Sequence, residues 1–299
     1  MKRPSRTSIR ILELPLPRSY RVADTLEFHQ RDPERVSERV DGPVLQKGLI
    51  WQGDPACLTV HFSSRRAVAQ LAVDGPERDG DGERFGRLVR RMLGLTQPVA
   101  VFERKYRQHP ALGPLIARHS GLRVPLVATP FEALSWAITS QQISVRAAVA
   151  ARRKLVRLAG KPHSGGLLCY PDAKAVARLE PADLRAAGFT LGKAEALVAL
   201  AREISSGTLP LQRWADTLPV EEIRATLLSR RGIGPWTVDY ALMRGFGWLD
   251  GSLHGDVAMR RQLQRVLGSR EPVSAPQARE WLSAFSPWRA LVAFHLWAA

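Results

Sequence analysis

Two glycines around residue 233 and an aspartate at position 256 are the residues whose spacing suggests chemistry. Gly232 and Gly234 flank a single apolar residue, and Pro235 follows them directly. Proline suits the first turn of a helix, because its missing N–H has no intrahelical partner there. The pattern predicts two helices joined by a tight hairpin. The free amides of such a hairpin, together with the dipole of its second helix, favour an anion such as phosphate.

The phosphate site is expected within a helix-hairpin-helix at about residues 220–245, and its predicted members are Arg230, Arg231, Gly232, Gly234 and Thr237. Contacts of this kind position a nucleic acid without reading its bases. A plainer interpretation remains open, because a Gly-x-Gly corner is also chosen simply to join two helices tightly.

Asp256 lies twenty residues beyond Trp236, after a glycine and directly before an apolar pattern with helical spacing. One interpretation makes Asp256 the N-cap of that helix, where a carboxylate accepts first-turn amides. The other makes it a partly desolvated carboxylate that stabilises positive charge on a reacting group. The residues alone leave both interpretations open.

Charge supports a polyanionic partner. The chain of 299 residues has 44 Lys and Arg against 28 Asp and Glu, a formal net charge of +16. A GC-rich coding sequence also enriches arginine, but we favour nucleic acid over a membrane or an acidic protein. Cys57 and Cys169 lie far apart with no CxxC spacing, which argues against structural zinc, an iron–sulfur cluster and a disulfide framework.

No apolar run approaches the roughly 18 residues of a membrane span, and the basic opening residues precede no signal-peptide core. We therefore expect a cytoplasmic protein, associated with the nucleoid when it is bound to DNA, with no membrane partner and as a monomer.

Residues 1–112 resemble a small α+β domain. Short β-rich segments at 48–52 and 57–62 are bounded by turn residues, and 83–95 has the spacing of an amphipathic helix. The polar cluster at 74–82 is expected to be a solvated loop rather than a metal site.

Residues 113–299 are predicted to be almost entirely helical, so the expected fold is mainly α with a smaller amino-terminal α+β domain. Helices are predicted over residues 131–158, 193–205 and about 288–297. Two further helices are predicted to begin at residues 181 and 257, and another to end near residue 229.

The segment RRGIGPWT, followed twenty residues after its tryptophan by the aspartate of HGDVAMR, resembles the helix-hairpin-helix DNA glycosylase superfamily. Within it the sequence is most similar to the DNA-3-methyladenine glycosylase II family. Three further segments match in order: PFEALSWAITSQQISVRAAVAARRKL, LRAAGFTLGKAEALVALAREISSGTLPL and SPWRALVAFHLW. The similarity starts at about residue 113, and the catalytic aspartate loop is expected at about 250–257.

The resemblance implies hydrolysis of the N-glycosidic bond of alkylated bases in double-stranded DNA, with Asp256 as the catalytic carboxylate. Bifunctional members place a lysine after the hairpin, where this chain has Trp236, and no lysine follows Lys193. We therefore expect no lyase activity. No cofactor or metal is implied, although a monovalent cation on the hairpin carbonyls is plausible.

The damaged base must leave the helix stack before it can react. Trp236 and Tyr240 share a helix face at i and i+4, and Trp297 matches a late tryptophan of the family. These three side chains are the predicted base pocket, with ordinary core packing as the alternative for each.

Gln142 stands where the family has an apolar side chain that fills the gap left by the flipped base. It is either a gap-filling amide or a plain junction residue. Arg289 is expected near the site as a phosphate or supporting partner, or else as a solvated arginine. Glu132, Glu195 and Asp239 are expected to have surface or supporting roles.

Two other functions fit part of the pattern. A non-catalytic helix-hairpin-helix module would keep the phosphate site without needing Asp256. A glycosylase for oxidised or deaminated bases would keep the fold and the reaction but change the substrate.

Overall fold

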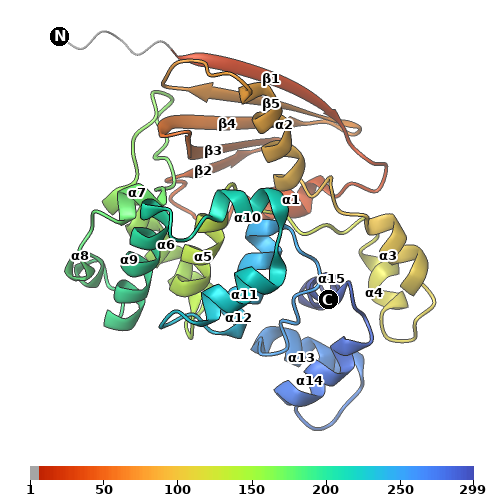
Figure 1. The fold of residues 1–299 in the computed structure, drawn as a ribbon. Helices are drawn as coiled ribbons and strands as arrows, with labels where there is room; N and C mark the ends of the chain where they lie inside the picture. Colours follow the sequence, from red (N-terminus) through yellow and green to blue (C-terminus); the bar gives the residue numbers. More distant parts are fainter. Residues whose placement is uncertain (1–6) are drawn as a thin grey trace, which may run out of the picture.

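The computed structural model describes residues 7–299, so the basic opening residues 1–6 lie outside the described residues. An antiparallel sheet forms the first layer, in the order β1-β5-β4-β3-β2 (Figure 1). Its strands are β1 (Ser8–Pro15), β2 (Glu38–Asp41), β3 (Val44–Trp51), β4 (Asp54–Phe62) and β5 (Arg66–Val73), with α1 (Val22–His29) between the first two.

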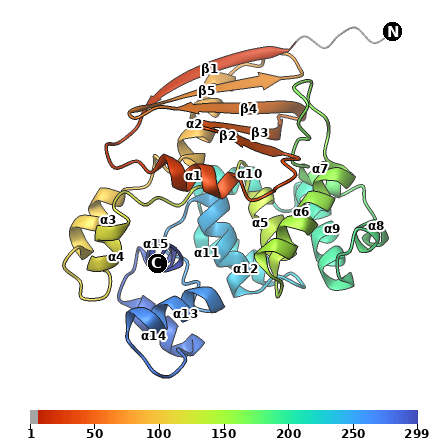
Figure 2. The same ribbon diagram turned by 180° about the vertical axis from the view of Figure 1, so that it is seen from behind.

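One face of the sheet is apolar and forms its own core. Along β5 buried and half-exposed residues alternate, as the period of a strand requires. Helix α2 (Asp81–Met92) packs Phe85, Val89 and Met92 into this core against residues such as Leu58 and Leu71. The sheet and α2 thus form one compact layer on one side of the molecule (Figures 1 and 2).

The remaining regular elements of the described chain are helices joined by loops. They are α3 (Val99–Tyr106), α4 (Gly113–Arg118), α5 (Pro130–Ser140), α6 (Val145–Ala159), α7 (Ala173–Val176), α8 (Pro181–Ala186), α9 (Leu191–Ser206), α10 (Leu211–Thr217), α11 (Val220–Leu228), α12 (Pro235–Ala241), the π-helix η1 (Leu242–Phe246), α13 (Val257–Val266), α14 (Ala275–Ser283) and α15 (Arg289–Trp297).

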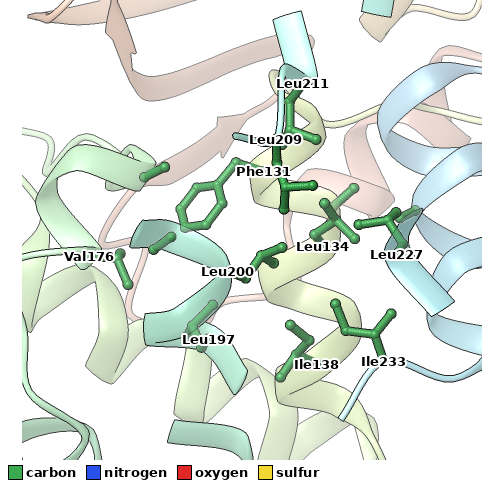
Figure 3. Packing of buried hydrophobic residues seen from close by; sticks show 14 of the residues in the cluster. Phe131, Leu134, Ile138, Val176, Leu197, Leu200, Leu209, Leu211, Leu227 and Ile233 are labelled. Carbon is green, nitrogen blue, oxygen red and sulfur yellow. The ribbon is translucent and has the colours of Figure 1, made fainter. Parts of the chain in front are cut away.

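Helix α12 lies between two helical cores. Val238 and Ala241 face the core formed with α5 and α9, whereas Tyr240 faces the core formed with α3, α4 and α13–α15. Ile233, between the two glycines of the hairpin, is buried in the first core and lies near Ile138 (Figure 3). The apolar residue between the glycines therefore anchors the hairpin, as the sequence predicts.

Buried charges join the sheet to the helices. Lys47 of β3 is fully buried and donates at 2.6 Å both to Glu38 of β2 and to Glu132 of α5. Arg152 of α6 contacts the same two carboxylates at 3.0 and 2.9 Å. The Nδ1–H of His29 donates to the Glu38 carboxylate at 2.7 Å. Charges removed from water require such pairing, so this cluster ties the two layers together.

The structure confirms a mainly helical fold with an amino-terminal sheet, but three details differ from expectation. The helical run expected over 131–158 is divided into α5 and α6 at residues 141–144. Residues 99–112, which we expected in the amino-terminal domain, contribute Phe102 and Tyr106 to the core of α13–α15. Asp81, expected in a solvated loop, is buried and accepts from the Trp51 indole at 3.2 Å.

Over residues 7–299 no helix combines the length and the apolar character needed to cross a membrane. Within the same residues no three His, Cys, Asp or Glu side chains gather in a way that would hold a metal ion.

Candidate active site

The hairpin after α11 has the geometry that its glycines predict. Gly232 has φ +83°, and a Cβ there would lie 2.9 Å from the Cβ of Ala196 on α9. Both the backbone angle and the close approach therefore require glycine. Gly234 is the N-cap of α12, and Pro235 occupies its first turn.

The side chains around the hairpin differ in how accessible they are. Arg231 projects into solvent with 93% of its side chain exposed, and its nearest acid, Glu195, is 3.8 Å away. Arg230 is instead paired with Glu203, whose Oε2 accepts from its Nε at 2.9 Å. Thr237 is buried, and its hydroxyl accepts from Gln141. Because this side chain is buried, the phosphate contact expected of Thr237 stays a prediction.

Asp256 is held by three donors. Its Oδ1 accepts from the backbone N–H of Met259 at 2.8 Å, which makes it the N-cap of α13. The same oxygen accepts from the Trp297 indole at 3.0 Å, and Oδ2 accepts from the Trp236 indole at 3.1 Å. The two interpretations of Asp256 are thus compatible. A cap alone needs no indoles, whereas a half-buried carboxylate fixed by two tryptophans is oriented for a further task.

The loop that carries Asp256 is anchored at its start. Asp250 accepts from Nε and Nη2 of Arg289, each at 2.8 Å, and from the Ser286 hydroxyl at 2.9 Å. The bond to Asp250 raises the pKa of Arg289, so the guanidinium is charged. Because Arg289 begins α15 and Trp297 ends it, one helix holds both the base of the loop and its carboxylate.

The predicted aromatic pocket is only partly assembled around the carboxylate. Trp236 and Tyr240 pack with ring centroids 5.2 Å apart. Tyr240 also lines a hollow whose walls do not include Asp256 or either indole that holds it. Its lining residues include Phe28, Arg31, Val127, Trp136 and Tyr240. Tyr240 therefore contacts Trp236 and also lines a hollow with residues from the amino-terminal part of the chain, which the sequence did not predict.

The junction between α5 and α6 presents Gln142. This residue is exposed and adopts φ +56°, which is uncommon for a residue other than glycine. Ile143 beside it is 42% exposed. The neighbouring Gln141, which the sequence analysis did not single out, donates to the hairpin. Its position beside Gln142 was the only signal for it.

The other acidic candidates are engaged elsewhere. Glu132 is buried in the cluster with Lys47 rather than on the surface. Asp239 is buried on α12 and paired with Arg224, and its burial raises the pKa of the carboxyl group. Glu195 is half-exposed beside Arg231. None of them shares the two indole donors of Asp256.

Two carbonyls of the hairpin already accept hydrogen bonds from within the protein. The Gly232 carbonyl accepts from Gln141 at 2.9 Å, and the Arg230 carbonyl accepts from the amide of Ile233 at 3.2 Å. Each of these oxygens keeps a second lone pair, so a monovalent cation at the hairpin stays a prediction.

A family model described as the HhH-GPD superfamily base excision DNA repair protein matches residues 135–286, which contain the α5–α6 junction, the hairpin and Asp256. The chain belongs to this superfamily. The match covers just over half of the sequence and includes the elements that position the candidate site.

Two bacterial proteins show similarity over longer stretches of the chain. DNA-3-methyladenine glycosylase 2 of Escherichia coli is 34% identical over 189 residues, which cover 62% of this chain and 64% of that protein. DNA-3-methyladenine glycosylase of Bacillus subtilis is 22% identical and aligned over 96% of both chains. The alignment to the E. coli protein thus spans slightly less than two thirds of its length.

The fold is shared over almost the whole chain with the 3-methyladenine DNA glycosylase of Archaeoglobus fulgidus. The TM-score is 0.83 at 23% identity, with 96% of this chain and 97% of that chain covered. The amino-terminal sheet is therefore part of a fold that the two proteins share.

Proposed function

We propose that this protein is a monofunctional DNA glycosylase that hydrolyses the N-glycosidic bond of alkylated bases in double-stranded DNA. The observation that carries the proposal is the Asp256 carboxylate, which is fixed by the indoles of Trp236, twenty residues before it, and of Trp297. The names of the E. coli and B. subtilis relatives support 3-methyladenine as the type of substrate.

The reaction builds positive charge on the deoxyribose as the bond to the base breaks. A carboxylate near the sugar stabilises that charge and orients the attacking water. The three hydrogen bonds to Asp256 hold it in one orientation, so no reorganisation is needed as the charge develops. An alkylated base that is already cationic leaves as a neutral molecule, so a dedicated general acid is dispensable.

The hairpin and its surroundings would bind the strand beside the lesion. Arg231 supplies an exposed guanidinium, and the amides around Gly232 and Gly234 supply neutral donors. Gln142 would enter the gap that the extruded nucleotide leaves. The net charge of +16 favours DNA approach without sequence preference.

The absence of lyase activity is part of the proposal. An amine nucleophile is needed to form a Schiff base with the sugar. Trp236 occupies the position after the hairpin, and Lys193 donates instead to the carbonyls of Thr139 and Gln141. Product DNA should therefore contain an abasic site on an intact strand.

The decisive experiment measures the free bases released from duplex DNA treated with dimethyl sulfate. Wild-type protein should release 3-methyladenine and 7-methylguanine, and Asp256→Asn should bind the duplex without releasing them. Strands should break only after alkali. Binding without release by the wild type would favour the non-catalytic module, and release only from oxidised or deaminated duplexes would favour the other glycosylase.

A further inference from the structure

Gln141 connects the two parts of the site that face DNA. Its Nε2 donates to the carbonyl of Gly232 and to the hydroxyl of Thr237, each at 2.9 Å. One partner lies in the hairpin and the other in α12, although both are more than 90 residues away along the chain. A single amide thus ties the α5–α6 junction to the hairpin and to the helix that follows it.

Lys193 of α9 fixes the same junction from the other side. Its Nζ donates to the carbonyl oxygens of Thr139 and Gln141, at 2.8 and 2.7 Å. These carbonyls belong to the end of α5, where the helix leaves its acceptors unpaired. Partial burial lowers the pKa of Lys193. Since Ala196 of the same helix packs against Gly232, α9 supports both the junction and the hairpin.

The connection continues to the catalytic carboxylate. Thr237 follows Trp236 directly, and the Trp236 indole donates to Asp256. Gln142, the exposed residue at the tip of the junction, follows Gln141 directly. The residue that would enter the DNA and the carboxylate that would act on the sugar are therefore connected through one amide and one indole.

We propose that Gln141 is a positioning residue that keeps Gln142 in register with the hairpin and with Asp256, and that Lys193 is its second anchor. This inference rests on the proposed function for its link to base removal. Insertion into DNA can nevertheless be measured without chemistry. Without Gln141 the hairpin still binds phosphate, but the junction is free to move relative to it.

The test uses the full chain and a duplex with 2-aminopurine opposite a tetrahydrofuran abasic-site analogue. Binding of the wild type should change the fluorescence as Gln142 enters the gap, and Gln142→Ala should abolish the change. Gln141→Met, which keeps the length of the side chain but removes both donors, should lower the fraction inserted about 10-fold. Affinity for an undamaged duplex should stay within about 2-fold, because phosphate contacts dominate it.

Matched variants separate positioning from general support of the fold. Gln212→Met, at an exposed glutamine of α10, should change nothing. Lys193→Met should resemble Gln141→Met, and Lys193→Arg should restore insertion, because arginine can donate to two carbonyls. Thr237→Val removes one acceptor, so Gln141→Met combined with Thr237→Val should be no worse than Gln141→Met alone.

Full insertion by Gln141→Met would overturn the proposal, as would a loss of insertion matched by equal losses of undamaged-duplex affinity and of thermal stability. No fluorescence change with the wild type would also overturn it, since Gln142 would then not enter the gap. Base release from alkylated DNA is measured separately. The positioning role and the proposed chemistry can therefore fail independently.

Discussion

Replacing Asp256 with asparagine should expose a conflict with one particular tryptophan. Oδ1 accepts from both Met259 and Trp297, so the amide oxygen of asparagine must take that place. The amide NH₂ then faces the Trp236 indole N–H, which lies 3.1 Å from Oδ2 in the native protein. Two donors would oppose each other, while the helix cap itself is kept, because asparagine caps as well as aspartate.

The loss of stability expected for Asp256→Asn follows from the hydrogen bond that is lost and the donor that is left without a partner. A hydrogen bond to a charged acceptor and a half-buried donor left without a partner together cost about 2 kcal/mol. Trp236→Phe removes the opposing donor, so it should lower the free energy of unfolding less in the Asp256→Asn background than in the wild type. The expected coupling in the double-mutant cycle is about 1–2 kcal/mol.

Urea unfolding of the four proteins at pH 7 measures this coupling. Trp281→Phe on α14, combined with Asp256→Asn, is the matched control and should be additive. Excision by Trp236→Phe should fall about 10-fold, since the carboxylate keeps two of its three donors. Additive effects of Trp236→Phe and Asp256→Asn would refute the geometry described for the site.

Three other variants test the surroundings of the site. Arg289→Leu leaves the mostly buried Asp250 without its cation, so chemical denaturation should show a loss of about 3 kcal/mol in the free energy of unfolding. Excision should also fall, because the loop that carries Asp256 loosens. Unchanged stability would contradict the anchoring role of Arg289. Gly232→Ala forces φ +83° on alanine and a 2.9 Å contact with Ala196. Thermal melts should therefore show a loss of about 2 kcal/mol in stability, and titrations should show a weaker affinity for duplex DNA. Unchanged stability and affinity would show that alanine is tolerated there. Burial lowers the pKa of His295 to about 3, so the folded state binds fewer protons than the unfolded state. The free energy of unfolding should therefore fall by about 2 kcal/mol between pH 6.5 and 5. His295→Leu should flatten this pH profile, and an equally steep profile would assign the loss to other groups.

The parts of the site that the sequence predicts are those with local signals. The hairpin follows from the conformational needs of glycine and proline within four residues, and Asp256 follows from its place before an apolar helical pattern. The late Trp297 came from resemblance, because no local rule connects it with residue 256. The break between α5 and α6 escaped a purely periodic prediction, since the apolar pattern continues through it.

The remaining features depend on contacts between distant segments. Gln141 lies 91 residues from Gly232, and its role becomes visible only when both ends of that contact are placed. Phe28 lines the hollow beside Tyr240 only because the sheet and the helices pack together. Lysine is ordinarily a surface residue, yet Lys47 is fully buried between carboxylates from two layers.

The fully buried Lys47 also limits how this protein can be shortened. Trimming the chain to its helices would expose Glu132 and Arg152 to water and would remove Lys47 and Glu38, their charged partners in the sheet. The two side chains would then be solvated and still paired with each other at 2.9 Å, so a minimal version would keep only a surface contact that contributes little stability.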